Sequence, residues 1–171
     1  MKKFLRIFVV AGCLFFFATA QVKSQRLVFL FGHLAYNIPS ESSFKDNYNF
    51  GLGGEAGAGI GWNKTFITGT VGINFFNSTG NNQLGNAIVY PVKFGLRQYL
   101  VGKMVYLHAD AGVSTVKYKN VDANGCFSAD AGIGAKLLGL EVQLDYDGFS
   151  RPYASGYSSW IGIKAGYSFG L

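Results

Sequence analysis

Apolar and polar residues alternate with a period of two along most of the chain after residue 26. In residues 140–147, for example, apolar side chains occupy the even positions and Glu, Gln or Asp the odd ones. Such alternation is typical of β-strands with one apolar and one polar face. In the first such stretch Arg26 and His33 fall on opposite faces, which indicates a bulge or a different boundary. The expected strands are residues 26–37, 50–62, 65–77, 87–100, 103–118, 125–137, 140–148 and 157–169.

Three connections are short enough to be two-residue hairpin turns, at 63–64, 101–102 and 138–139. A two-residue turn fixes which residues of the flanking strands lie opposite each other. The other connections are longer, so the short turns share one end, as in an up-and-down antiparallel meander. The expected partners match in polarity: Ile60 with Ile67, Lys93 with Asp110, and Lys136 with Glu141.

The composition of the polar face distinguishes a membrane barrel from a soluble one. Only 14% of the residues are charged, 49% are hydrophobic, and 24 of the 171 are Gly. A soluble exterior would carry dense Lys and Glu, whereas small Gly, Ser, Thr and Asn side chains suit the crowded lumen of an eight-stranded barrel. Apolar outer faces with Trp62, Tyr167 and Phe169 near the short turns suit lipid and an interfacial aromatic girdle. We therefore predict an all-β fold, an eight-stranded antiparallel up-and-down transmembrane β-barrel.

The N-terminal residues have the pattern of a secretory signal peptide. Three basic residues precede an apolar run at 7–17, which is too short to span a bilayer, and Ala18-Thr19-Ala20 follows. We expect cleavage before Gln21, which leaves a barrel domain of residues 21–171. In an alternative interpretation, Cys13 ends a bacterial lipoprotein box and is acylated.

Charge and cysteine content exclude several classes of function. Removal of the signal peptide with its three basic residues lowers the formal net charge from +6 to +3, and no basic block with interleaved aromatic residues remains. We therefore expect no nucleic-acid binding. Cys126 would be the only cysteine left, which excludes an intramolecular disulfide and a Cys-based zinc cluster.

Six acidic and four basic residues, together with one histidine, are expected to point into the lumen. Because buried charges need partners, we interpret them as a structural salt-bridge network rather than an ion or proton path. Asp130 and Asp147 are expected opposite each other, which would require a nearby base or a shared proton. The expected lumen residues are Glu55, Lys93, Arg97, His108, Asp110, Asp130, Lys136, Glu141, Asp145, Asp147 and Lys164.

The sequence offers no catalytic constellation. Asp145 and Asp147 could act as an acid–base pair, but a filled lumen provides no substrate groove. His108 and Asp110 lack a Ser placed by a recognisable elbow motif, and no His-x-Ser motif is present. We expect no enzymatic activity, and the sequence assigns no cofactor site and no metal site.

The signal peptide, the eight strands and the alternation of short turns with long loops resemble the small outer-membrane barrels of Gram-negative bacteria. These are the OmpA/OmpX-type barrels and the porin-like barrels of Bacteroidetes. The end of the chain resembles the assembly signal of that family, with Lys164, Gly166, Phe169 and Leu171 at its key positions, although Phe is usual where Leu171 stands. The resemblance implies a monomer in the bacterial outer membrane, in contact with outer-membrane lipid and inserted by the barrel assembly machinery.

The function expected from these observations is a membrane-embedded structural or interaction module with extracellular loops. Its partner would be an extracellular or outer-membrane protein. Two alternatives stay open: a narrow porin-like channel for small solutes, and a secreted soluble β-barrel that binds an apolar ligand. The candidate loop contacts are Phe44, Tyr48, Arg151 and Tyr153.

Overall fold

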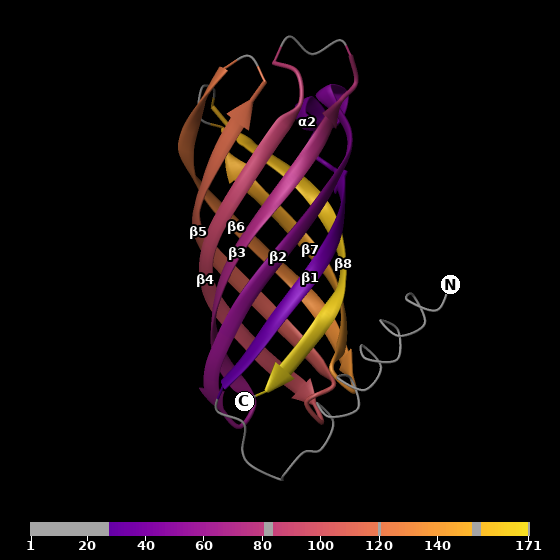
Figure 1. Cartoon of the computed structure of the whole chain (residues 1–171), viewed down its shortest axis with the longest axis vertical. Coiled ribbons are helices and arrows are strands. Elements are labelled where there is room, and N and C mark those ends of the chain that lie inside the picture. Colours follow the sequence, from indigo (N-terminus) through magenta and orange to yellow (C-terminus); the bar gives the residue numbers. More distant parts are fainter. Residues whose placement is uncertain (1–27, 81–83, 120, 152–154, 171) are drawn as a thin grey trace, which may run out of the picture.

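Eight antiparallel strands close into one barrel, in which each strand pairs with its neighbours in sequence and β1 pairs with β8 (Figure 1). The computed structural model describes residues 28–80, 84–119, 121–151 and 155–170, without the side chains of residues 121–124. The expected signal peptide, Cys13, Arg26, Tyr153 and Leu171 lie outside this part. The strands are β1 (Val28–Pro39), β2 (Tyr48–Trp62), β3 (Thr65–Ser78), β4 (Ala87–Val101), β5 (Val105–Tyr118), β6 (Val121–Leu137), β7 (Leu140–Ser150) and β8 (Tyr157–Gly170).

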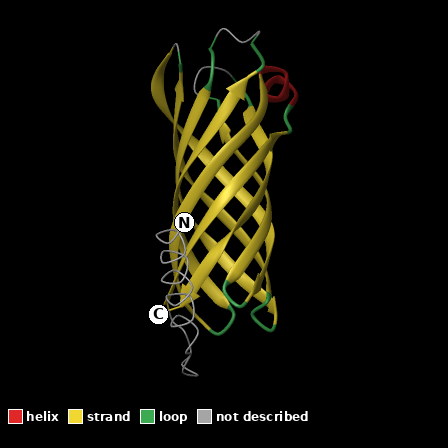
Figure 2. Ribbon diagram, turned by 45° about the vertical axis from the view of Figure 1, so that its right-hand side comes forward, coloured by secondary structure: helices red, strands yellow, loops and turns green. Residues whose placement is uncertain are grey.

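The fold class predicted from the alternation is confirmed. Each predicted strand overlaps an observed one, and the largest difference is that β6 begins at Val121 rather than at residue 125. One short helix, α2 (Ser42–Asn47), stands between β1 and β2. Figure 2 shows this helix at the end of the barrel opposite the short turns. No helix within the described ranges has the length and apolar character needed to cross a membrane.

Two of the three predicted hairpin registers are confirmed. Ile60 lies opposite Ile67 across the turn between β2 and β3, and Lys136 lies opposite Glu141 across the turn between β6 and β7. Asn63 in the first of these turns has a positive φ of 56°. The tight turns thus set the register as expected.

The predicted pairing of Lys93 with Asp110 is wrong by two residues. Lys93 lies opposite Gly112, and the strands are offset by an irregularity between Tyr99 and Val101. The turn comprises the three residues 102–104 instead of two, with Gly102 and Lys103 at positive φ (52° and 61°). A shift of two residues leaves every side chain on its expected face, because the side-chain period of a strand is two.

The first strand runs without a bulge through its described part. Its register with β2 and with β8 is uninterrupted, and His33 lies on the lumen side together with Phe29 and Phe31. The expected irregularity is therefore absent between Val28 and Pro39. The face of β1 was ambiguous in the sequence because its inward positions include two phenylalanines, so the two faces differ little in polarity.

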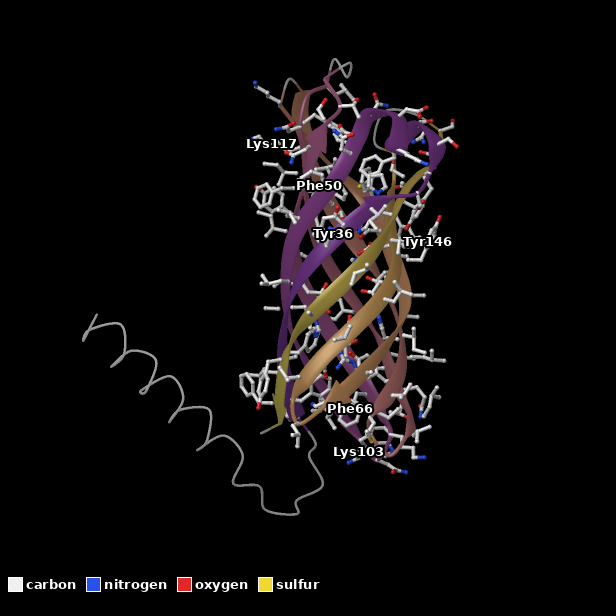
Figure 3. All side chains as sticks on the ribbon, turned by 90° about the vertical axis from the view of Figure 1, so that its right-hand side faces the viewer. Tyr36, Phe50, Phe66, Lys103, Lys117 and Tyr146 are labelled. Carbon is white, nitrogen blue, oxygen red and sulfur yellow. The ribbon has the colours of Figure 1, made fainter. Side chains whose placement is uncertain are left out.

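The barrel is apolar outside and polar inside. Large hydrophobic side chains point outward from the strands, with 77% of Leu34, 69% of Phe94 and 46% of Ile133 exposed. Figure 3 shows side chains such as Tyr36 and Tyr146 projecting from the outer surface. A soluble barrel that binds an apolar ligand would have the reverse arrangement, so this alternative disagrees with the structure.

Two aromatic clusters occupy the ends of the lumen. The outer cluster lies at the loop end, where Phe44 of α2 packs among strand residues, and the inner cluster lies at the short-turn end near Phe66 (Figure 3). Charged lumen residues adjoin the inner cluster, where Arg97 and Lys136 lie over the Phe29 ring. The outer cluster consists of Phe44, Tyr48, Phe76, Ala87, Val89, Val116, Tyr118, Phe149 and Trp160. The inner cluster consists of Phe29, Phe31, Phe66, Tyr99 and Tyr106.

Candidate functional site in the barrel lumen

All eleven residues that the alternation assigns to the lumen have buried or half-buried side chains inside the barrel. His33 joins them, and sequence reasoning missed it because the facing of the first strand was ambiguous. Every one of these side chains comes from a strand, so the pleat of the sheet aims it inward. The lumen network is therefore built by strand periodicity and not by loops.

Glu141 is the centre of the network next to the inner aromatic cluster. Its carboxylate lies 3.1 Å from Arg97 Nη1 and accepts hydrogen bonds from Tyr106 Oη (3.1 Å) and Ser168 Oγ (2.7 Å). His33 Nε2 lies 3.0 Å from the same carboxylate. A buried carboxylate with this many donors is well satisfied.

The predicted ion pair of Lys136 with Glu141 is present, but it is longer than the other contacts of the Glu141 carboxylate described above. Lys136 Nζ lies 3.7 Å from Glu141 Oε1, and it also donates a hydrogen bond to Ser168 Oγ. Arg97 contributes more to the local packing, because its guanidinium lies over the rings of Phe29 (4.9 Å) and Tyr106 (4.2 Å). Such cation–π contacts link the ion pairs to the aromatic cluster.

A ladder of hydrogen bonds connects Glu141 to the middle of the barrel. His33 Nδ1 lies 2.9 Å from Glu55 Oε1, and Lys164 Nζ lies 2.7 Å from Glu55 Oε2. Lys164 also lies 2.7 Å from Asp145 Oδ2. These partners come from strands that are far apart in sequence, so they meet only because the barrel closes.

Asp130 and Asp147 lie opposite each other on β6 and β7, as the register predicted. The base that their juxtaposition requires is Lys93 of β4, whose Nζ lies 2.5 Å from Asp130 Oδ2 and 2.8 Å from both oxygens of Asp147. The sequence had paired Lys93 with its neighbour in the hairpin. The actual partners lie across the lumen.

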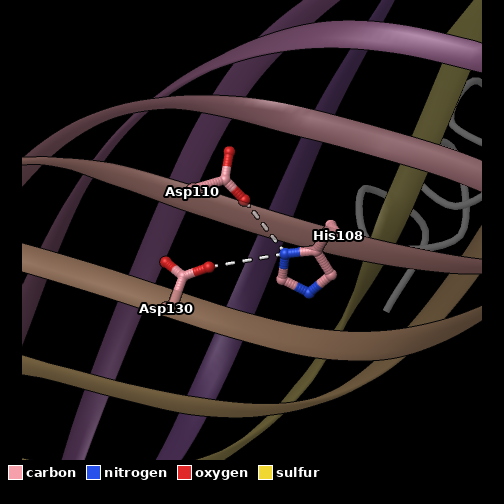
Figure 4. Close-up of side chains that lie close together, drawn as sticks. All are labelled: His108, Asp110 and Asp130. Atoms are coloured by element: carbon pink, nitrogen blue, oxygen red, sulfur yellow. Dashed lines mark hydrogen bonds and ion pairs between the residues drawn. The ribbon is translucent and has the colours of Figure 1, made fainter.

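His108 has a carboxylate on each side of its ring. Its Nδ1 lies 3.0 Å from Asp110 Oδ2 and 3.4 Å from Asp130 Oδ1 (Figure 4). Its Nε2 lies 2.8 Å from Asp145 Oδ1. The potential ligand atoms of His108, Asp110 and Asp130 lie within 4.8 Å of one another, and they are the one such group among the described residues.

A small cavity of about 10 Å³ adjoins this group, with Thr70, Asp110, Asp130 and Lys164 among its lining residues. A polar space of this size is close to the minimum that holds one water molecule. This cavity therefore has no space for a solute larger than water.

At the loop end, Glu41 fixes α2 to the rest of the barrel. Its carboxylate accepts hydrogen bonds from the backbone N–H groups of Ser43 (3.0 Å) and Phe44 (2.9 Å) and forms an ion pair with Arg151. Partial burial raises the pKa of Glu41, but the Ser43 amide, Arg151 and the Phe44 amide outweigh it and hold the pKa below its ordinary value.

The residues that the sequence suggested as loop contacts have different surroundings in the structure. Phe44 and Tyr48 are buried in the outer aromatic cluster, so the expectation that they face outward disagrees with the structure. Arg151 is partly exposed and is bound to Glu41. The physical reason is that α2 turns its one large apolar residue back into the barrel mouth instead of exposing it to water.

The residues of the resembled assembly signal have distinct surroundings in β8. Lys164 is buried in the lumen, and Phe169 is partly exposed on the outside. Gly166 allows β8 to approach β1, since a Cβ at this position would lie 1.9 Å from the backbone oxygen of Gly32 and 2.6 Å from the His33 ring. A glycine is thus required where His33 enters the network.

Comparison with known proteins finds likeness in fold alone. No protein-family model matches the chain, and no curated protein matches it. Among solved structures, neisserial surface protein A has a TM-score of 0.62 at 11% identity, covering 87% of this chain and all of that one. The N-terminal β-barrel domain of Pseudomonas aeruginosa OprF has a TM-score of 0.61 at 9% identity (85% and 100% covered). The Yersinia pestis outer membrane protein Ail has a TM-score of 0.55 at 16% identity (82% and 99% covered).

The described chain therefore has the fold of the small eight-stranded outer-membrane barrels. At identities of this size the likeness defines the architecture and leaves the particular role to be argued from the residues.

Proposed function

We propose that the protein is an integral protein of the bacterial outer membrane whose lumen is a packed structural core. The observation that carries the proposal is the closed belt of exposed apolar side chains, to which each of the eight strands contributes at least two large residues. Soluble monomers rarely expose contiguous apolar patches larger than a few hundred Å². A closed barrel also satisfies every strand edge, which is the condition for crossing hydrocarbon.

Aromatic residues at both edges of the belt support this location. Trp62 and Phe169 lie on the outside near the short turns, and Tyr36 and Tyr146 lie on the outside towards the loop end (Figure 3). Tyrosine and tryptophan favour the interface between lipid and water. By the usual orientation of such barrels, the short turns face the periplasm and α2 faces outward. The chain would reach this site by its signal peptide and the barrel assembly machinery.

The packed lumen favours a structural or interaction module over a narrow channel. The charged side chains bind one another, and aromatic clusters occupy both ends. A passing ion would have to break several buried pairs, each of which is costly to leave unmatched. We therefore assign contacts with an extracellular or outer-membrane protein to the outer loops of a monomeric barrel.

Three measurements test the proposal. The protein should stay in the membrane pellet after washing with carbonate or urea and dissolve only in detergent. It should migrate anomalously in SDS until it is boiled, because a closed barrel resists the detergent. In planar bilayers it should give no stepwise conductance. Release by carbonate would contradict the membrane location, and stable conductance steps would contradict the closed lumen and support the channel.

A further inference from the structure

Three potential metal ligands converge inside the barrel at His108, Asp110 and Asp130 (Figure 4). His108 Nδ1 lies 3.0 Å from Asp110 Oδ2 and 3.4 Å from Asp130 Oδ1. Around a tetrahedral Zn²⁺ ion, with bonds of about 2.0–2.2 Å, neighbouring ligand atoms are separated by roughly 3.3–3.6 Å. The distances from His108 Nδ1 to the two carboxylate oxygens are thus close to this spacing, and the potential ligand atoms all lie within 4.8 Å of one another.

The orientation of His108 is that of a metal-binding histidine. Its Nε2 lies 2.8 Å from Asp145 Oδ1, which leaves Nδ1 directed at the two other carboxylates. Metal-binding histidines almost always donate their second N–H to a carboxylate, a backbone carbonyl or water, and this fixes the tautomer and the ring. Asp145 would have this positioning role here.

The two aspartates are also held so that one oxygen of each is directed at His108. Thr68 Oγ1 donates to Asp110 Oδ1 at 2.9 Å, so Oδ2 is left for the common centre. Lys93 Nζ binds Asp130 Oδ2 at 2.5 Å, so Oδ1 is left for the same centre. Each prospective ligand therefore has a second partner that orients it.

A buried carboxylate oxygen at the common centre is incompletely satisfied. Asp130 Oδ1 accepts no hydrogen bond, and His108 Nδ1 lies 3.4 Å from it, although the Asp130 side chain is only 6% exposed. Asp130 and Asp110 line the cavity of about 10 Å³, which has room for one water molecule as a fourth ligand. A cation bound at this point would satisfy the orphan oxygen.

The described lumen is rich in carboxylates, a ligand type that divalent cations use in proteins. Its carboxylates outnumber its Lys and Arg side chains by two. The carboxylates are Glu55, Asp110, Asp130, Glu141, Asp145 and Asp147, and the cations are Lys93, Arg97, Lys136 and Lys164.

His33, the other buried histidine, has no such geometry. Glu55 lies on its Nδ1 and Glu141 on its Nε2, so its two carboxylates bind opposite sides of the ring and share no common centre. It offers the same residue type at similar burial without the convergence, and is therefore the matched control.

We propose that His108, Asp110 and Asp130 bind one divalent transition-metal ion, with Zn²⁺ as the ion that fits best. An imidazole among the ligands favours zinc over magnesium or calcium, which prefer oxygen ligands alone. Because aromatic clusters occupy both ends of the lumen, the ion enters before the strands close and then exchanges slowly. The site consists of lumen residues only, and the proposal goes beyond the proposed function. Absence of zinc binding would leave the proposed function intact.

The test is to refold the full chain from urea into detergent micelles with Zn²⁺, remove loose metal with a chelator, and measure the metal that stays bound. The folded fraction is checked by its heat-dependent migration in SDS. We expect one zinc per folded chain in the wild type and in His33→Gln. Asp110→Asn keeps the shape of the side chain but loses its charge, and should bind zinc at least about tenfold more weakly. Refolding with Co²⁺ should add visible absorption bands in the wild type and in His33→Gln, and much weaker bands in Asp110→Asn.

Thr68→Val keeps the proposal testable if Asp110→Asn does not fold, because it removes only the hydroxyl that orients Asp110. It should weaken zinc binding in a folded barrel, by a smaller factor. Substoichiometric zinc in the folded wild type would overturn the proposal. So would full zinc in folded Asp110→Asn, or an equal loss of zinc in His33→Gln.

Discussion

Asp130 and Asp147 lie directly opposite each other on neighbouring strands, and the single ammonium group of Lys93 binds both. Replacement of this lysine would leave two opposed carboxylates without their cation in the lumen. The free energy of unfolding of Lys93→Met should therefore be about 3–5 kcal/mol lower than that of the wild type, as for other broken buried ion pairs. Reversible urea unfolding in lipid vesicles at neutral pH measures it.

Lys117→Met is the control, because Lys117 is exposed on the outer side of β5. Its effect should stay within about 0.5 kcal/mol. The double variant Lys93→Met/Asp147→Asn should regain part of the lost stability, since one of the two opposed charges is removed. Equal effects of the two lysine variants would show that Lys93 is not an essential counterion.

The facing of β6 is tested by Ile133, which points outward with 46% of its surface exposed. If this surface meets hydrocarbon, Ile133→Arg should lower the free energy of unfolding in lipid vesicles by about 2–4 kcal/mol. In detergent-free extraction the variant should still behave as a membrane protein. An Ile133→Arg barrel as stable as the wild type would mean that this face does not meet lipid.

Lys136→Met, in the same strand, tests the opposite face. The hairpin register alone would make Lys136 the main counterion of Glu141. The structure adds Arg97, His33 and two hydroxyl donors to that carboxylate, so its charge stays compensated without Lys136. We expect a smaller loss of stability than for Lys93→Met in the same unfolding assay. A loss of stability as large as that of Lys93→Met would show that the other donors do not compensate the charge of Glu141.

The ion pair of Glu41 with Arg151 should make the packing of α2 against the barrel sensitive to acid. Because the pKa of Glu41 is lowered in the folded barrel, the pair contributes stability above the ordinary value of 4.5 and loses it as the pH falls through the lowered value. The contribution of such a partly exposed pair is about 1 kcal/mol or less.

Trp160, whose ring lies 6.1 Å from that of Phe44, reports this change by its fluorescence. The measurement is made in a Trp62→Phe background, which leaves one tryptophan. Arg151→Met should alter the emission at neutral pH but not in strong acid, where the wild type has already lost the pair. Identical emission of both proteins at neutral pH would contradict the coupling.

The C-terminal residues are predicted to direct insertion. If the assembly machinery recognises Phe169 and Leu171, changing both to Asp should deplete the protein from the outer membrane while synthesis continues. Quantitative immunoblots of membrane fractions give the result. Tyr167→Phe, which keeps an aromatic ring in the same strand, is the control and should insert normally. Normal insertion of the double Asp variant would remove the basis of the proposed signal.

The alternation of residues was sufficient to predict the faces of every strand except the first, but not the partners of the charges. The turn after β4 comprises residues 102–104, one residue more than the two-residue turn predicted at 101–102. Nothing in the local sequence distinguishes the two forms of this turn. A register shift of two residues leaves each side chain on the same face of the sheet but changes the residue that lies opposite it.

Contacts across the lumen cannot be predicted from the alternation along the strands. Lys93 meets Asp147, and Lys164 meets Glu55, from strands that are not neighbours in the sheet. Which of them meet is set by the tilt and stagger of the closed barrel, a property of all eight strands together. The burial of Phe44 was missed for a similar reason, because a six-residue helix inside a connection has no periodic signal.

The two aromatic clusters separate the ion pairs of the lumen from the electrolyte on either side. Dissolved salt weakens exposed ion pairs because its ions screen charges over a distance of about 8 Å at physiological strength. Screening requires that the ions come near, and the side chains packed at both ends hinder their approach to the buried pairs of the lumen. The stability contributed by these pairs should thus depend less on salt than that of exposed pairs such as Glu41 with Arg151.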